Sequence, residues 1–175
     1  MNYATIKKCD IANGEGVRVS LFVSGCTHHC KNCFNQVAWD FNYGTPFTAE
    51  TEEEIFAELE KSYVNGLSLL GGEPFEPQNQ LALLPFVKKV REKFPQKNIW
   101  CYTGFTFDED TGLLKETTKN CAVTKELLEN IDVLVDGAFI EELKDISLVF
   151  RGSSNQRIID VKKTLASGKV VLYLE

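Results

Sequence analysis

The sequence predicts a single α/β domain over residues 1–175, built as an incomplete β/α barrel of mainly parallel strands. Three observations support this prediction: short apolar runs alternate with helical patterns, each run ends in glycine or a polar residue, and the chain has only 175 residues. Alternating strands and helices are typical of a parallel sheet. A complete barrel of eight β/α units takes about 250 residues, so this chain is too short to close one.

The first half of the chain predicts a strand, a helix and a second strand. Apolar residues alternate over 17–23, which indicates a strand. A helix is expected to begin at Thr51, whose spacing to Glu54 is that of a capping box, and to end at 65–66 (Asn-Gly). The apolar run 67–72 ends in two glycines, as does a buried strand that leads into a functional loop. The apolar face of the expected helix carries Ile55, Phe56, Leu59 and Tyr63.

The second half repeats this alternation. A helical stripe over 81–94, starting at Leu81, contains Pro85, which requires either a kink or a new helix start. Further elements are expected as a strand at 98–104, a helix at 124–131, a strand at 132–137, and a strand, helical turn and strand over 156–174. Ligands gather at the carboxyl ends of parallel strands. We therefore expect four loops to converge on one site, namely those starting at Gly25, Gly71, Thr103 and Asp136.

Charge and composition exclude several classes of protein. The net charge of −6 argues against a nucleic-acid partner held by bulk electrostatics. No apolar run reaches membrane length, and the first residues lack the apolar core of a secretory signal. A cytoplasmic protein without a membrane partner is therefore expected. In that compartment the six cysteines are expected to be thiols or metal ligands rather than disulfides.

Cys26, Cys30 and Cys33 form a C-x3-C-x2-C motif directly after the strand at 17–23. The spacing is compatible with an iron–sulfur cluster that has three cysteine ligands and one free iron, and this is the interpretation it favours. A closed zinc site with a fourth ligand and a set of unmetallated thiols stay open as alternatives. The candidates for the fourth zinc ligand are His28, His29, Cys9, Cys101 and Cys121.

A second motif, LLGGEPF at 69–75, follows the next buried strand. Gly71 and Gly72 let the backbone approach a ligand closely, and exposed backbone groups together with Glu73 can hold an ammonium group. An ordinary strand-to-loop turn is the alternative. One β/α unit separates the two motifs, so adjacent parallel strands are expected to bring them side by side.

Together, the two motifs resemble the radical S-adenosylmethionine superfamily. The resemblance implies a partial barrel with one [4Fe–4S] cluster, whose free iron chelates the amino and carboxylate groups of S-adenosylmethionine. It implies that the cluster ligands are Cys26, Cys30 and Cys33. It places Gly71, Gly72, Glu73 and Pro74 around the methionine amino group, and Asn32, Cys33 and Phe34 around the adenine. Asn32 stands where the superfamily usually has an aromatic residue, and Phe34 offers an apolar contact instead.

Three further segments, 98–109, 131–145 and 150–161, extend the resemblance over nearly the whole chain. They are similar to the family of activating enzymes for anaerobic (class III) ribonucleoside-triphosphate reductases, and RGSSNQRIID at 151–160 is the most particular of them. The family implies that reduced flavodoxin or a similar donor reduces the cluster. S-adenosylmethionine then yields methionine and a 5′-deoxyadenosyl radical, which generates a glycyl radical on the partner reductase. The rival hypotheses are a radical S-adenosylmethionine enzyme acting on a small molecule and a non-enzymatic zinc-binding interaction module.

Expectations for the remaining polar residues are less specific. Thr103 and Asp136 end strands on the ligand side and are predicted to contact the cofactor, with a strand-end cap as the alternative for Asp136. His28 and His29 are expected to face solvent. No catalytic side chain beyond the cluster and cofactor is predicted. Cys9, Cys101 and Cys121 are expected to be small buried hydrophobes, and a solvated loop or a cofactor or partner contact is expected of Arg151, Ser153, Asn155, Gln156 and Arg157.

Overall fold

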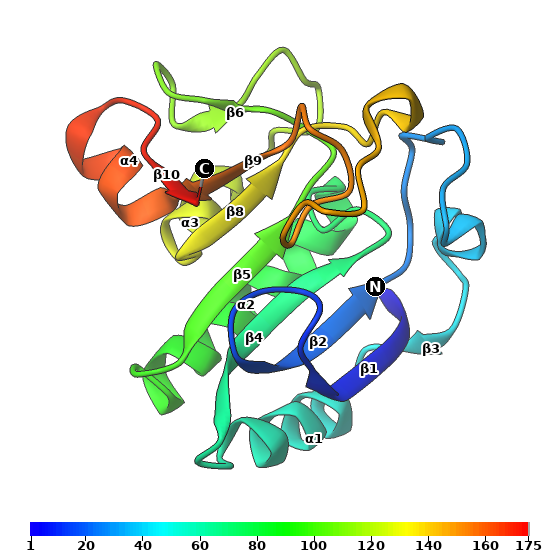
Figure 1. Cartoon of the computed structure of the whole chain (residues 1–175). Coiled ribbons are helices and arrows are strands. Elements are labelled where there is room, and N and C mark those ends of the chain that lie inside the picture. The colour runs from blue at the N-terminus through cyan, green and yellow to red at the C-terminus, as the bar shows by residue number, and fades with distance from the viewer. Residues whose placement is uncertain (175) are drawn as a thin grey trace.

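The computed structural model describes residues 1–174 and is organised around a mixed eight-stranded sheet (Figure 1). The central strands β2, β4, β5 and β8 are parallel, which confirms an α/β fold with a parallel centre. In spatial order the strands are β10 (Leu172–Leu174), β9 (Arg157–Asp160), β8 (Val133–Asp136), β5 (Asn98–Tyr102), β4 (Val64–Gly71), β2 (Val17–Val23), β1 (Asn2–Asp10) and β3 (Thr45–Pro46).

The edges of the sheet are antiparallel, so the parallel arrangement expected from the sequence holds for the centre of the sheet only. The cause is the type of connection. Only the short segment 11–16 joins β1 to β2, and a connection of that length permits an antiparallel pair but no parallel crossover. β9 pairs antiparallel with β8 after the segment 137–156, which has no α-helix to carry the chain back.

Each parallel pair is joined by a helix. These helices are α1 (Ala49–Leu59), α2 (Pro77–Lys93) and α3 (Thr124–Glu129). The remaining elements are α4 (Val161–Ser167), the 3-10 helices η1 (Gln36–Trp39) and η2 (Glu141–Leu143), and a small hairpin of β6 (Phe107–Asp108) and β7 (Leu113–Leu114). In Figure 1, α2 and α3 lie behind the sheet, and the segment 137–156 crosses in front of it. No helix among residues 1–174 is both long and apolar enough to cross a membrane.

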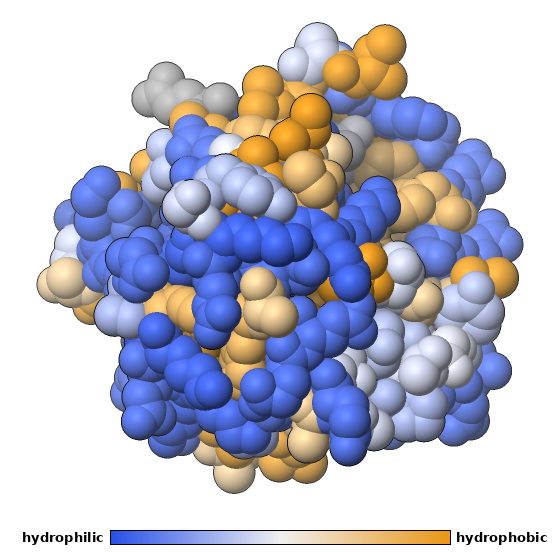
Figure 2. All heavy atoms as spheres, turned by 90° about the horizontal axis from the view of Figure 1, so that it is seen from below, coloured by the Kyte–Doolittle hydropathy of each residue, from blue (hydrophilic) through white to orange (hydrophobic). Residues whose placement is uncertain are grey.

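The two faces of the sheet have different interiors. Alternate residues of the central strands, such as Leu21, Leu69 and Ile99, are fully buried against the helices and form the main core. The opposite face carries a smaller cluster around Trp100, whose ring packs edge-on against Phe150 at 5.3 Å. This second face is the floor on which the segment 137–156 rests. Seen from below, where α1 lies, the surface is mostly hydrophilic with scattered apolar residues (Figure 2).

The boundaries of α1 differ from those predicted. The N-cap is Thr48 and not Thr51, because Thr51 occupies the N3 position and accepts a hydrogen bond from the Thr48 amide at 3.2 Å. The helix ends at Leu59, and residues 65–66 already belong to β4. Asn65 accepts a hydrogen bond from the Val17 amide through its side chain, which explains a turn-type residue inside a strand. Tyr63 is therefore exposed and was wrongly assigned to the helix face.

α2 runs uninterrupted through Pro85. Pro85 is exposed, so water can take the backbone carbonyl that it leaves without an amide partner. Leu81 is also exposed, and the apolar stripe predicted to include it begins instead at Leu83.

Candidate functional site

A cavity of about 520 Å³ opens at the carboxyl ends of the central parallel strands. The four loops expected to meet do converge on it, since Cys26, Gly71, Thr103 and Gly137 all contribute to its wall. The cysteine loop (residues 24–35), which follows β2, and the segment 137–156 provide much of the remaining wall. The rim includes Phe34 and Ile146, which are 88% and 96% exposed.

Most of the residues singled out from the sequence line this cavity. They are Cys26, Cys30, Asn32, Cys33, Phe34, Gly71, Gly72, Glu73 and Thr103. Pro74 is buried outside the lining. Asp136 also lies outside it, because its carboxylate accepts hydrogen bonds from Arg157 Nε at 3.0 Å and from the Phe107 amide at 2.8 Å. These contacts favour the strand-end cap that was the alternative for Asp136, and its contact with a cofactor stays a prediction.

Asn32 has a left-handed backbone conformation, with φ of 57°. Asparagine adopts this conformation more readily than other non-glycine residues, whereas a bulky side chain is disfavoured there. The local turn between Cys30 and Cys33 thus gives a physical reason for asparagine at a position where the resemblance implies an aromatic residue.

The two glycines of the second motif allow the motif to lie directly against the cysteine loop. The Gly72 amide donates to the Val23 carbonyl at 2.7 Å, and the Glu73 amide donates to the Gly25 carbonyl at 2.8 Å. A β-carbon on Gly71, where φ is 108°, would lie 2.7 Å from the Phe22 backbone. Close contact between the two motifs therefore requires residues without a side chain at these positions.

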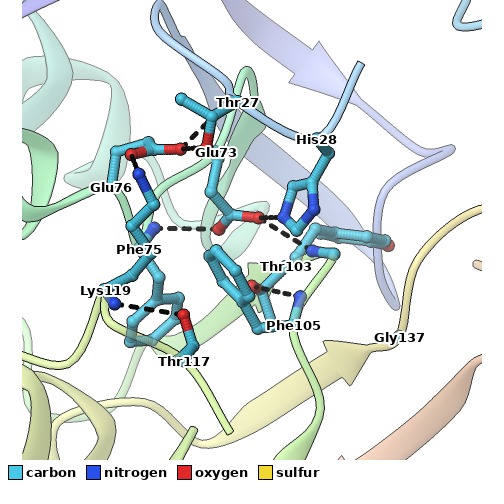
Figure 3. A network of polar contacts seen from close by, with 12 residues as sticks. Thr27, His28, Glu73, Phe75, Glu76, Thr103, Phe105, Thr117, Lys119 and Gly137 are labelled. Atoms are coloured by element: carbon cyan, nitrogen blue, oxygen red, sulfur yellow. Dashed lines mark hydrogen bonds and ion pairs between the residues drawn. The ribbon is translucent and has the colours of Figure 1, made fainter. Parts of the chain in front are cut away.

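Glu73 holds three separate parts of the site through its buried carboxylate (Figure 3). Oε1 accepts a hydrogen bond from the Phe75 amide at 2.9 Å. Oε2 accepts one from the Gly104 amide at 2.8 Å and lies 2.7 Å from Nε2 of His28. The carboxylate therefore connects its own turn, the loop after β5 and the cysteine loop.

Glu76, which is 2% exposed, connects the cysteine loop to a different part of the chain. Its Oε1 accepts hydrogen bonds from the Thr27 amide at 3.0 Å and the Thr27 hydroxyl at 2.5 Å. Its Oε2 pairs with Lys119 Nζ at 3.0 Å. Both acids of the GGEPFE sequence thus stabilise the residues that separate Cys26 from Cys30, a role that motif spacing alone did not reveal.

His28 does not face solvent as expected, whereas His29 does. The His28 ring packs at 4.3 Å from the Phe105 ring, and its side chain is only 17% exposed. Burial lowers the pKa of His28, but the hydrogen bond and charge of Glu73 outweigh it and raise the pKa overall. His29 stacks on Trp39 at a ring distance of 4.5 Å.

Replacing Glu73 with Gln tests the importance of this connection. Each carboxylate oxygen accepts one backbone amide, and an amide side chain has only one oxygen, so one buried N–H would lose its acceptor. We expect a loss of about 1–3 kcal/mol in the free energy of unfolding, measured by urea denaturation. Glu142→Gln is the matched control, because Glu142 also contacts the cysteine loop, at Lys31, but is exposed. Equal stabilities for the two variants would contradict the account.

The three cysteines of the motif suit a cluster with three thiolate ligands. Burial raises the pKa of Cys26 to about 12 and also raises the pKa of Cys30, so both are neutral thiols until a metal displaces their protons. Within residues 1–174 no three His, Cys, Asp or Glu side chains are already close enough to form a metal site. The three thiols and the cavity they share therefore fit a [4Fe–4S] cluster. The thiols are not yet close enough to bind one metal group, so cluster binding has to draw them together.

The candidates for a fourth zinc ligand fit poorly. Of the five named above, only His28 lines the cavity, and its Nε2 is already bonded to Glu73. Cys101 is fully buried on the helix face of β5, as predicted. Cys9 is exposed, so the prediction that it is buried was wrong, and Cys121 is half-buried with its thiol directed at Gln80 Oε1, 3.5 Å away.

Sequence reasoning missed several residues of the cavity wall, including Trp39, Tyr102, Phe139 and Phe150. Tyr102 directly precedes Thr103 at the end of β5, so its position was a usable signal. Trp39 ends the short helix η1, and Phe139 and Phe150 lie in irregular segments; neither setting has a periodicity that indicates which side chains point inward.

Comparison with known proteins identifies the relatives of this chain. The family model described as "4Fe-4S single cluster domain" matches residues 12–159. The anaerobic ribonucleoside-triphosphate reductase-activating protein of Pasteurella multocida is 45% identical over 160 residues, covering 90% of this chain and 96% of the relative. The proteins of the same name from Escherichia coli K12 and Enterobacteria phage T4 are 42% and 40% identical, covering 89% and 90% of this chain and 96% and 93% of those relatives.

The matches cover the cysteine motif, the glycine pair and all four central strands. This chain therefore belongs to the 4Fe-4S single cluster domain family and, within it, to the family of anaerobic ribonucleoside-triphosphate reductase-activating proteins.

Proposed function

We propose that this protein activates an anaerobic ribonucleoside-triphosphate reductase by generating a glycyl radical on it in the cytoplasm. The observation that carries the proposal is that Cys26, Cys30 and Cys33 share one cavity with the glycine pair and Glu73. The relatives support the choice of partner, since they are named as activators of that reductase. The proposal includes the partial β/α barrel of the radical S-adenosylmethionine superfamily as the fold.

In this proposal Cys26, Cys30 and Cys33 hold a [4Fe–4S] cluster as thiolates. When bound, the cluster supplies the electron, received from reduced flavodoxin or a similar donor, that splits S-adenosylmethionine into methionine and a 5′-deoxyadenosyl radical able to take a hydrogen atom from the partner's glycine. The chain's own residues bind, orient and shield these groups, as in other cofactor enzymes.

The contributions of individual residues follow from their positions. Gly71 and Gly72 line the cavity with backbone, beside which the methionine part of the cofactor can lie, while the Glu73 carboxylate keeps the cysteine loop in place. Thr103 lines the wall and binds its own turn, since its hydroxyl accepts a hydrogen bond from the Phe105 amide at 3.1 Å. Asn32 and Phe34 stand near the rim, where an adenine ring can lie against them.

The shape of the cavity favours a polypeptide substrate over a small molecule. Its rim carries the exposed side chains of Phe34 and Ile146, which leaves an opening where a glycine-containing loop of a partner can enter. A zinc-binding module is disfavoured, because the candidate fourth ligands lie outside the cavity or are engaged elsewhere.

The proposal predicts that anaerobically reconstituted protein converts S-adenosylmethionine to equal amounts of 5′-deoxyadenosine and methionine when dithionite is added. Chromatography measures both products, and omission of the reductant is the control. A colourless protein with bound zinc, or a fully iron-loaded protein that forms no 5′-deoxyadenosine, would refute the proposed chemistry.

A further inference from the structure

Arg151 lies in the cavity wall with part of its guanidinium unpaired. Its Nε is inaccessible to solvent and has no hydrogen-bond partner among residues 1–174. The hydrogen bond recorded for its side chain runs from Nη1 to the Gln156 carbonyl at 3.0 Å. Nε is thus an unsatisfied buried donor. Nη2 also has no hydrogen-bond partner among residues 1–174 but is open to solvent, so it is the part of the guanidinium that an acceptor in the cavity can reach.

The RGSSNQR segment is folded in a way that fixes Arg151 in place. Gln156 Oε1 accepts hydrogen bonds from the amides of Gly152 at 2.9 Å and Ser153 at 3.1 Å. Gln156 Nε2 donates to the Gly137 carbonyl at 3.0 Å, which attaches the segment to the end of β8. The polar residues of this segment therefore form a built loop and not a loosely solvated one.

The residue before Arg151 adds a second constraint. Phe150 has a left-handed φ of 56°, an uncommon conformation for a bulky residue and one that is found where structure is held for function. Its ring is held by the edge-on contact with Trp100, which is fully buried in the sheet beneath the segment 137–156. Arg151 is thus presented from a strained and anchored position.

The structure supplies no counter-ion for Arg151 within residues 1–174. No carboxylate of those residues lies within 4.0 Å of its guanidinium, whereas Arg157 in the same segment pairs with Asp136. Asp145 also lines the cavity, and its amide donates to the Gly152 carbonyl at 3.3 Å. Its carboxylate accepts hydrogen bonds from the amide and the hydroxyl of Ser147 and does not pair with Arg151. An unneutralised cation therefore faces the cavity.

We propose that Arg151 binds the carboxylate of the amino-acid part of S-adenosylmethionine, which makes it a determinant of cofactor affinity. This inference rests on the proposed function. A carboxylate is the one anionic group of that cofactor, and a guanidinium matches it in charge and shape. The carboxylate of Glu73 in the same wall is already bonded to His28 and two backbone amides, so Arg151 is the group left to attract an anion.

The test compares two ligands that differ only in the carboxylate. Equilibrium dialysis of reconstituted holoprotein gives Kd for S-adenosylmethionine and for decarboxylated S-adenosylmethionine, with wild type and Arg151→Gln. We expect the variant to bind S-adenosylmethionine about 10- to 100-fold more weakly. Its affinity for the decarboxylated ligand is expected to equal that of wild type. Lys144→Gln is the control for general charge effects, because Lys144 also lines the cavity; its loss should weaken S-adenosylmethionine binding far less than Arg151→Gln does.

Arg151→Lys provides a second variant that keeps the charge and is expected to bind S-adenosylmethionine with intermediate affinity. Iron content and circular dichroism show whether each variant is folded and loaded. Equal weakening of both ligands by Arg151→Gln, or no weakening of either, would overturn the inference alone. Failure of loaded wild type to bind S-adenosylmethionine would instead overturn the proposed function and the inference with it.

Discussion

Cys30→Ala protein, reconstituted without oxygen, is expected to lose its iron–sulfur absorbance and all cleavage of S-adenosylmethionine. Cys30 lines the cavity with Cys26 and Cys33, and three thiolates are the minimum set in the proposed site. Mutating a residue that merely hydrogen-bonds to a metal ligand typically lowers metal affinity or activity by about 10- to 100-fold. Removing a ligand itself is therefore expected to lower cluster binding by more than about 100-fold.

Cys9→Ala is the matched control for this experiment. Cys9 is an exposed thiol on β1, outside the cavity wall. Its removal should leave the iron content and the yield of 5′-deoxyadenosine unchanged. Retention of full iron by the Cys30 variant, or its loss in the Cys9 variant, would contradict the assignment of ligands.

Gly72→Ala is expected to disrupt the site by steric contact. A β-carbon there would lie 2.6 Å from the Gly25 carbonyl oxygen and 3.1 Å from that of Ala38. Both are backbone atoms, so the strand end and the cysteine loop must separate, at a cost of about 1–3 kcal/mol. We expect a lower free energy of unfolding together with much reduced iron uptake, because the cysteine loop is displaced.

Gly168→Ala is the control that shows whether reduced iron uptake comes from displacement of the cysteine loop or merely from lower stability. Gly168 caps α4 with φ of 67°, and nothing lies within 4 Å of the β-carbon position. Alanine there is strained by its backbone conformation, at roughly 1 kcal/mol, far from the cysteines. The variant should lose stability but take up iron normally. Normal iron uptake by Gly72→Ala would show that close contact between the two motifs is not required.

The central part of the fold could be predicted because its signals are local. The strand at 17–23 and those ending in Gly71, Tyr102 and Asp136 appear as apolar runs followed by glycine or polar residues. β1 was missed, because most of its residues are polar or partly exposed and show no apolar alternation. Arg18 illustrates another limit, since it alternates with buried valines yet is fully buried itself, bonded to Ser68 at 2.6 Å and to Asn98 at 2.7 Å.

The motifs of the candidate site were also predictable, because they too are local in the sequence. The spacing of the three cysteines predicts metal ligands, and the glycine pair predicts a close approach of the backbone to a ligand. The contacts of Glu73 with His28 and of Glu76 with Thr27 join residues 45 and 49 positions apart, and no local pattern encodes them. Arg151 belonged to a segment noted for its polar composition, but only the folded loop shows that part of its guanidinium has no hydrogen-bond partner.

The central claim is tested most directly by electron paramagnetic resonance on the complete reaction. Reduced, iron-loaded protein is mixed with S-adenosylmethionine and the anaerobic ribonucleoside-triphosphate reductase, and the spectrum is recorded with the wild-type and Cys30→Ala proteins. The account predicts a glycyl radical doublet on the reductase with wild type and none with the variant. Absence of the doublet with fully loaded wild type, or its appearance with the Cys30 variant, would contradict the account.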